Sequence, residues 1–281
     1  MRLGHRAAAA AICLFASSLA AVPAFAEKQG GILRMYHRDS PASASIHEEA
    51  TYSNNVPFMP VFNNLVLYKQ DVKQNSLQSI VPELATDWAW SADNTKLTFN
   101  LRGGVKWHDG KPFTARDVVC TFDMLMDKAA AKFRKNPRKT WYDNVAEVTA
   151  NGDAQVVFSL KRPQPALIAL LASGYTPIYP CHVSPSDMRT HPIGTGPFKF
   201  VSFKQNESIT LTRSPDYCGT KPAPSAAKAA MRQSSGRPSR PDAPRAVAMA
   251  GVRRAKCGPP CQPGHDTSAA TAAATASASQ A

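Results

Sequence analysis

Residues 97–120 read LTFNLRGGVKWHDGKPFTARDVVC and predict a strand, a tight turn and a helix in succession. Apolar and polar side chains alternate over Leu97–Leu101, which is typical of a strand with one buried face. His108–Pro112 has the Gly and Pro content of a turn. Thr114 and Asp117 then stand in the positions of a helix-capping pair, with Asp in the place that Glu usually takes.

The residues after this cap predict an amphipathic helix. Val118, Phe122, Leu125 and Met126 recur at the spacing that places side chains on one face of a helix. An apolar face of this kind needs a sheet or another helix to cover it. We therefore expect the strand and the helix to share one core.

The chain up to residue 217 contains further strand and helix patterns. Asn151-Gly152 predicts a hairpin with three or four loop residues. Because hairpins and helices alternate without an internal repeat, the sequence predicts an α/β fold with a mixed sheet. We expect strands at residues 31–36, 145–148, 155–160, 196–201 and 209–211, a helix-to-strand transition at 58–68, and a short proline-opened helix at 165–172.

The first 26 residues have the composition of an export signal. Arg2, His5 and Arg6 precede an apolar run over residues 7–22, and small residues stand at the positions of an A-x-A cleavage site that ends at Ala26. A membrane anchor is the alternative, but the run is short for the about 20 residues of a spanning helix. We expect cleavage after Ala26 and a mature protein in the periplasm.

Residues 218–281 differ in composition from everything before them. They contain no Phe, Trp, Tyr, Leu or Ile, and they hold nine Lys or Arg against two Asp or Glu. Ordering a residue costs about 1.5 kcal/mol, and this stretch has little apolar surface to bury in return, so we predict a disordered low-complexity tail. Much of the net charge of +13 belongs to it. No aromatic side chains stand between the basic ones, so nucleic-acid binding is not expected.

Two cysteines, Cys120 and Cys181, lie in the part of the chain that is expected to fold. In an oxidising compartment they could form a disulfide, which would stabilise the fold by roughly 4 kcal/mol in the chain-entropy model. Two unpaired buried thiols are the alternative. Cys257, Cys261 and His265 fit no common zinc spacing and lie in the predicted tail, so we expect no metal site.

No motif in the sequence indicates catalysis, since G-x-S-x-G and H-E-x-x-H are both absent. His108-Asp109 is interpreted as part of a turn. Gly194-Thr195-Gly196-Pro197 lacks the Lys of a phosphate-binding loop and precedes a strand, so its glycines are expected to let the backbone bend between domains. We expect neither enzymatic activity nor a cofactor, and an exported hydrolase is the less favoured alternative.

Three stretches together resemble the peptide- and nickel-binding solute-binding proteins of bacterial ABC importers, family 5. Leu97–Cys120 matches in order the pattern T-F-x-L-R-x-G-V-K-(W/F)-H-D-G-x-P-F-T-A-x-D-V. His191–Phe200, HPIGTGPFKF, is similar to the family's P-x-G-T-G-P-(Y/F) element, and Leu211–Tyr217, LTRSPDY, to its L-x-R-N-P-D-Y-W element. Pro82–Ala85 with Trp88 also fits a P-x-L-A-x-x-W segment.

This resemblance covers residues 30–217 and implies a monomeric substrate-binding component. Such a protein captures di- or oligopeptides in the periplasm, between two lobes that close about a hinge, and delivers them to the permease subunits of an ABC importer. The resemblance places ligand-binding groups in the loop after the first strand, Tyr36, His37, Arg38 and Asp39. Arg38 could contact a carboxylate and Asp39 an amine. Solvated loop charges are the alternative.

After Tyr217 the sequence departs from the family pattern, and we expect the second lobe to be missing. Capture would then be impaired, because a closed state needs ligand contacts from both lobes. A non-binding remnant is one alternative, and a binder of another small solute, such as a nickel chelate, an opine or a sugar, is a second. The predicted division is a signal peptide at 1–26, the amino-terminal part of a family 5 domain at 27–217, and a disordered tail at 218–281.

Overall fold

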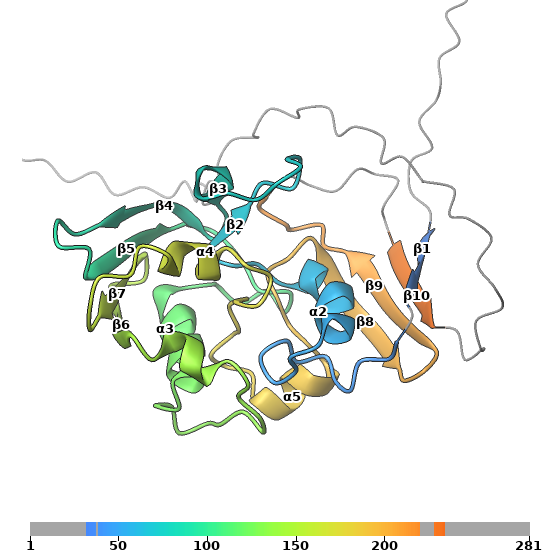
Figure 1. The fold of residues 1–281 in the computed structure, drawn as a ribbon. Helices are drawn as coiled ribbons and strands as arrows, with labels where there is room; N and C mark the ends of the chain where they lie inside the picture. Colours follow the sequence, from blue (N-terminus) through green and yellow to red (C-terminus); the bar gives the residue numbers. More distant parts are fainter. Residues whose placement is uncertain (1–31, 38, 220–227, 234–281) are drawn as a thin grey trace, which may run out of the picture.

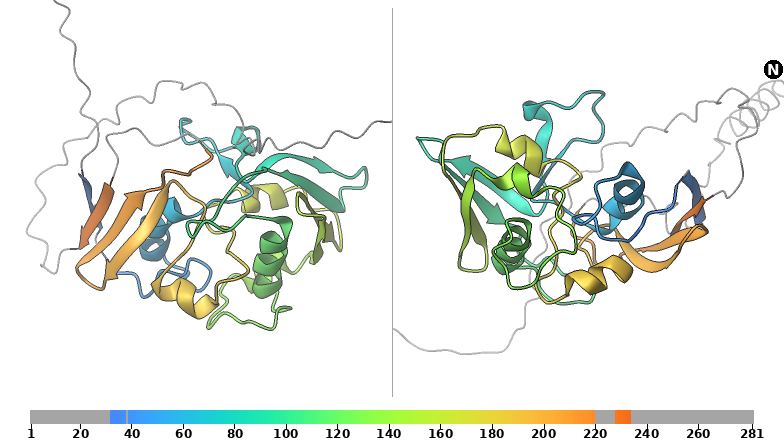
Figure 2. Two further views of the ribbon diagram at one scale, coloured as in Figure 1. Left: turned by 180° about the vertical axis from the view of Figure 1, so that it is seen from behind. Right: turned by 60° about the horizontal axis from the view of Figure 1, so that its bottom comes forward.

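The computed structural model describes residues 32–37, 39–219 and 228–233, which form a mixed α/β arrangement, as the sequence predicts (Figure 1). This part of the chain contains two four-stranded sheets and one two-stranded sheet. The two larger sheets lie at opposite sides of the molecule, with helices and loops between them (Figure 2).

The first sheet has the strand order β4-β5-β7-β6 and is antiparallel throughout. Leu97 and Phe99 of β5 and Phe158 of β7 are buried, which confirms the predicted alternation. The turn between β6 and β7 has three residues and contains Gly152 at a φ of +64°, a conformation that glycine adopts without strain. The strands are β4 Ala85–Trp90, β5 Lys96–Leu101, β6 Val145–Asn151 and β7 Gln155–Leu160.

Helix α3, Ala115–Leu125, packs against β6 and β7 of this sheet (Figure 1). The predicted cap is present, because the Thr114 side chain accepts from the Asp117 backbone and the Asp117 carboxylate accepts from the Thr114 backbone N–H at 2.9 Å. Val118 and Phe122 are buried on the face toward the sheet. The helix ends where Asp127 takes a left-handed φ of 59°.

The second sheet has the strand order β1-β10-β9-β8. Strand β1 pairs with β10 in parallel, and the other two pairs are antiparallel. Strand β8 begins two residues after the predicted start at 196 and ends three residues beyond 201, whereas β9 extends the segment predicted at 209–211 at both ends. The four strands are β1 Ile32–His37, β8 Phe198–Lys204, β9 Ser208–Arg213 and β10 Lys228–Gln233.

Strand β10 lies within the segment that the composition predicts to be a disordered tail from residue 218 onward. Residues 228–233 are paired on both sides, with β1 and with β9. Main-chain hydrogen bonds of this kind satisfy backbone groups without requiring large apolar side chains, and the composition argument did not count them. The rest of the predicted tail beyond Gly219, and the predicted signal segment with Ala26, lie outside the described residues.

Short elements connect the two larger sheets. The predicted helix-to-strand transition at 58–68 starts earlier, because α2 already ends at Phe58. No helix within the described ranges is both long enough and apolar enough to cross a membrane. The connecting elements are α2 Tyr52–Phe58, α4 Leu167–Leu171, α5 Pro185–Thr190, β2 Val66–Tyr68, β3 Ile80–Pro82 and 3₁₀ turns at Met59–Val61, Leu77–Ser79 and Lys139–Tyr142.

Candidate ligand-binding site

The loop that follows β1 is fixed by hydrogen bonds to neighbouring side chains. His37 is buried, and its Nδ1 lies 2.6 Å from the Asp39 carbonyl oxygen, so Nδ1 carries the proton in this tautomer. The Asp39 carboxylate accepts from the Ser40 backbone N–H at 2.9 Å and from the Ser53 hydroxyl at 2.8 Å. Tyr36 is 70 % exposed. Asp39 therefore presents an oriented carboxylate at the protein surface.

The four residues predicted to bind ligand are thus brought together only in part. Tyr36, His37 and Asp39 lie at the carboxyl end of β1, whereas Arg38 lies outside the described residues. The loop also reaches the β8–β9 turn, because Ser40 Oγ accepts from the Asn206 backbone N–H at 3.0 Å.

Arg138 connects the segment after this loop to the exposed ring of Trp141. The sequence patterns did not predict a role for Arg138. Its guanidinium donates to the carbonyls of Ile46 at 2.5 Å and Glu49 at 2.7 Å. It also lies over the rings of Tyr175, at 4.7 Å, and Trp141, at 5.7 Å, as in cation–π pairs. Arg138 is only 2 % exposed while Trp141 is 41 % exposed, so the buried cation supports an exposed aromatic side chain.

The segment beneath the loop is polar and buried. His47 is fully buried, its Nε2–H donates to the Pro177 carbonyl at 2.7 Å, and burial lowers its pKa to about 3. The imidazole is therefore neutral at physiological pH. The Glu48 carboxylate accepts from the Arg189 guanidinium at 2.9 Å. These contacts make the segment a rigid support for the Asp39 loop.

Three of the sequence stretches that carry the family resemblance meet at Asn63. Thr195 donates to Asn63 Oδ1 at 3.0 Å, and Asn63 Nδ2 donates to the Glu83 carboxylate and, at 3.5 Å, to the Tyr217 hydroxyl oxygen. The Asn64 backbone N–H donates to the other Glu83 oxygen at 2.7 Å. Burial raises the pKa of Glu83 to about 7. This largely buried network joins residues that are far apart in the described chain.

Gly194 and Gly196 also pack closely against backbone, a requirement that the sequence prediction of a bend here did not include. A Cβ on Gly194 would lie 1.8 Å from the Val61 carbonyl oxygen, and one on Gly196 would lie 2.5 Å from the Pro60 oxygen. Neither glycine has a positive φ. Close approach of two backbones, rather than an unusual turn, therefore requires glycine here.

His108 completes this junction. Its Nε2–H donates to the Gly196 carbonyl at 2.9 Å, and its Nδ1 accepts from the Gly194 N–H at 3.4 Å. Burial lowers its pKa to about 4. Both ring nitrogens are thus occupied by backbone. The neighbouring Asp109 carboxylate lies 2.7 Å from His182 Nε2.

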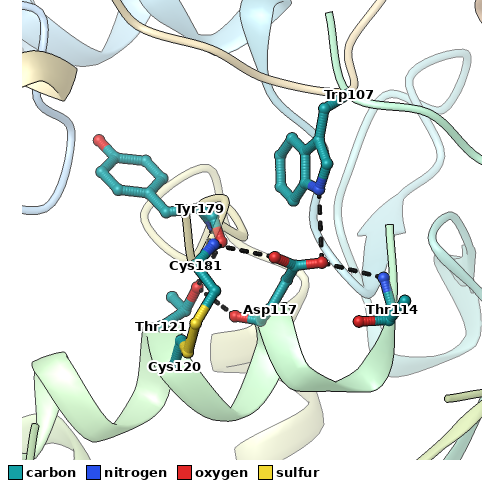
Figure 3. Close-up of a disulfide and its surroundings, with 7 residues drawn as sticks. All are labelled: Trp107, Thr114, Asp117, Cys120, Thr121, Tyr179 and Cys181. Atoms are coloured by element: carbon teal, nitrogen blue, oxygen red, sulfur yellow. Dashed lines mark hydrogen bonds between the residues drawn. A yellow bond between two sulfur atoms is a disulfide. The ribbon is translucent and has the colours of Figure 1, made fainter. Parts of the chain in front are cut away.

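Cys120 and Cys181 form a disulfide, with 5.5 Å between their Cα atoms (Figure 3). Of the two alternatives that the sequence left open, a disulfide or two unpaired thiols, the structure has the disulfide. Beside it, the buried Asp117 carboxylate accepts from the Cys181 backbone N–H at 2.8 Å and from the Trp107 indole N–H at 3.3 Å. Asp117 therefore caps α3 and anchors the segment that the disulfide attaches to that helix.

This fold, with its motif stretches assembled around Asn63, is that of a lobe of a solute-binding protein. Residues 79–237 match the family model described as bacterial extracellular solute-binding proteins, family 5, and the chain belongs to this family. The match begins later and ends later than the stretch of resemblance predicted at 30–217. It includes β10.

Two curated relatives show the same relationship. A putative ABC transporter peptide-binding protein of Brucella ovis is 33% identical over 172 residues, which is 57% of this chain and 30% of that protein. The dipeptide-binding protein of Escherichia coli is 30% identical over 185 residues, which is 58% of this chain and 34% of that protein. The chain therefore spans about a third of the length of the curated relatives that it matches.

A solved structure is similar over a larger part of the fold. It is the ABC transporter-associated periplasmic binding protein DppA of Helicobacter pylori in complex with the peptide STSA. The TM-score is 0.64 at 25% identity, and the likeness covers 73% of this chain and 43% of that one.

Proposed function

We propose that this chain is a substrate-binding component of an ABC importer and that it captures di- or oligopeptides outside the cytoplasm. Membership of family 5 carries the proposal, together with the naming of both curated relatives as peptide- or dipeptide-binding proteins. Permease subunits of the importer would be its protein partners, and it would act as a monomer.

The loop after β1 has the chemistry that peptide capture requires. A peptide presents an ammonium group, and charge-assisted hydrogen bonds to a carboxylate are among the stronger polar contacts in proteins. Asp39 is the carboxylate that we assign to this contact. The exposed ring of Trp141 would pack on a peptide side chain, because aromatic rings offer large apolar area at low entropic cost.

We further propose that the chain is exported, cleaved after Ala26, and active in the periplasm without enzymatic activity or a cofactor. The composition of residues 1–26 supports export. The contacts of His108 support a binding role, because both of its ring nitrogens are hydrogen-bonded to backbone and neither is left for proton transfer. The proposed division stays 27–217 for the binding domain, and the proposed tail at 218–281 is interrupted by β10.

Calorimetric titration of the chain with dipeptides and oligopeptides tests the proposed function. Dissociation constants for peptides in the millimolar range or weaker would agree with the predicted impairment of capture. Submicromolar dissociation constants would show that capture is not impaired. A nickel–histidine chelate, an opine and a sugar complete the panel. Saturable binding of one of these, with none of any peptide, would contradict the proposal.

Substitution of Asp39 tests which residue contacts the ligand. Asp39→Asn removes the charge and is expected to weaken peptide binding about tenfold, which corresponds to about 1.4 kcal/mol for a charge-assisted bond. Asp71→Asn removes the same charge from the exposed β2–β3 loop and is the matched control. Equal affinities for the two variants would mean that Asp39 is a solvated loop charge.

A further inference from the structure

The hairpin between β6 and β7 carries the one Asn-Gly pair of the sequence, Asn151-Gly152. Asn151 is the last residue of β6, and its side chain is exposed (Figure 1). Gly152 is the first of the three loop residues and is exposed as well. The peptide site proposed above, in the loop after β1, does not include this hairpin.

Gly152 leaves its own backbone nitrogen open to chemistry with the Asn151 side chain. A side chain on the residue after an asparagine hinders attack of that residue's nitrogen on the asparagine Cγ, and glycine has no side chain. A Cβ at Gly152 would have no atom within 4 Å, so water reaches this position. The Gly152 N–H donates to no group within the described ranges. The nitrogen is therefore protected neither by burial nor by a partner in this part of the chain.

A row of side-chain hydrogen bonds, the amide ladder, restrains the Asn151 amide. Asn151 Nδ2 donates to Gln155 Oε1 at 2.9 Å, and Gln155 Nε2 donates to Asn100 Oδ1 at 2.9 Å. Asn100 Nδ2 then donates to the Asp87 carboxylate at 2.6 Å. All three bonds are exposed, and water replaces such bonds at little net cost. The amide ladder therefore slows rotation of the Asn151 amide without preventing it.

We propose that Asn151 is a site of spontaneous deamidation. The Gly152 nitrogen gives its proton to solvent hydroxide and attacks Asn151 Cγ. The side-chain nitrogen takes up a proton from water and leaves as ammonia, so a cyclic succinimide remains. Water then opens this ring at either carbonyl and gives aspartate or isoaspartate. The net reaction consumes one water, releases one ammonia and turns a neutral amide into a carboxylate, with no oxidant, enzyme or cofactor.

The isoaspartate product lengthens the main chain by one methylene, in a loop that is attached to two other elements. The Asp153 carbonyl accepts from the Ala115 N–H at 2.9 Å, at the start of α3, and Ala115 is fully buried. The Ala154 carbonyl accepts from the Leu101 N–H at 2.7 Å, at the end of β5. A longer backbone directly before these residues displaces both carbonyls. Deamidation is therefore expected to weaken the attachment of α3 as the protein ages.

Peptide mass spectrometry of the full chain, incubated at mildly alkaline pH, tests the proposal. The peptide with Asn151 is expected to gain the mass difference between an amide and a carboxylate. Asn94 and Asn206 are internal controls, because both are exposed at hairpin turns but precede Thr95 and Glu207. Asn151 should react about tenfold faster than either of them.

The outcomes decide between reaction and protection. If Asn151 gained no mass in the folded chain but did so in the same chain unfolded in guanidinium chloride, the amide ladder would prevent the reaction and the proposal would be wrong. Equal rates at Asn151 and Asn94 would also overturn it. The melting temperature of the parent should fall during incubation while that of Asn151→Gln stays constant, and a parallel fall in both would contradict the effect on α3.

Discussion

Glu83 is a partly buried acid whose two carboxylate oxygens face neutral donors, the Asn63 amide and the Asn64 backbone N–H. Desolvation therefore outweighs these hydrogen bonds and the charge of Arg102, and the pKa rises from 4.5 to about 7. The folded protein binds this proton more tightly than the unfolded chain does. Glu83 thus links the stability of the Asn63 junction to pH.

The contribution of Glu83 to stability is expected to be full below about pH 4.5 and to be lost as the pH rises through about 7. The loss is on the order of 2 kcal/mol. Glu83→Gln cannot ionise and should flatten this part of the stability profile. Urea unfolding of both proteins at pH 5 and pH 8 measures it. Glu147→Gln, at an exposed position of β6, is the control, and a profile equally steep in Glu83→Gln would contradict the argument.

At the scale of single elements, α3 depends on one buried carboxylate. Asp117 accepts hydrogen bonds from the helix start at Thr114, from the Trp107 indole and from the Cys181 backbone (Figure 3). Asp117→Ala is expected to destabilise the protein by about 3 kcal/mol, because one buried and two partly buried donors lose their acceptor. Thr114→Ala removes one capping bond and should cost about 1 kcal/mol.

Urea unfolding of these two variants checks the ranking. Arg116→Ala changes an exposed residue in the first turn of the same helix and should stay within about 0.5 kcal/mol of the parent protein. Losses of equal size for Asp117→Ala and Thr114→Ala would mean that the carboxylate acts only as a cap.

Elements that are defined by local sequence patterns could be predicted, whereas those that depend on contacts between distant residues could not. The strand β5, the turn after it and helix α3 follow from local patterns of alternation, turn residues and capping, so their positions were predictable. Strand β10 was not, because its pairing with β1 joins residues about 200 positions apart, and no local pattern reports such pairing. Arg138 was missed for the same reason, since its partners Ile46 and Tyr175 are distant in the chain.

At the scale of the whole molecule, the disulfide closes a long loop, because Cys120 and Cys181 are 61 positions apart. Cross-linking at this separation restricts the unfolded chain and stabilises the folded one by roughly 4 kcal/mol. The double variant Cys120→Ser/Cys181→Ser is expected to lose stability of that order. Thermal unfolding compares it with the oxidised parent. A melting temperature that did not fall would show that the surrounding contacts suffice without the cross-link.

The position of β10 between β1 and β9 has a consequence for the time course of biosynthesis. Ile32 is among the first described residues to be made, yet its partner Lys228 follows about 200 residues later. At about 5–20 residues per second, the ribosome needs roughly 10–40 s to supply that partner. During this interval β1 lacks the one strand with which it pairs among the described residues, so this sheet stays incomplete until β10 has been synthesised.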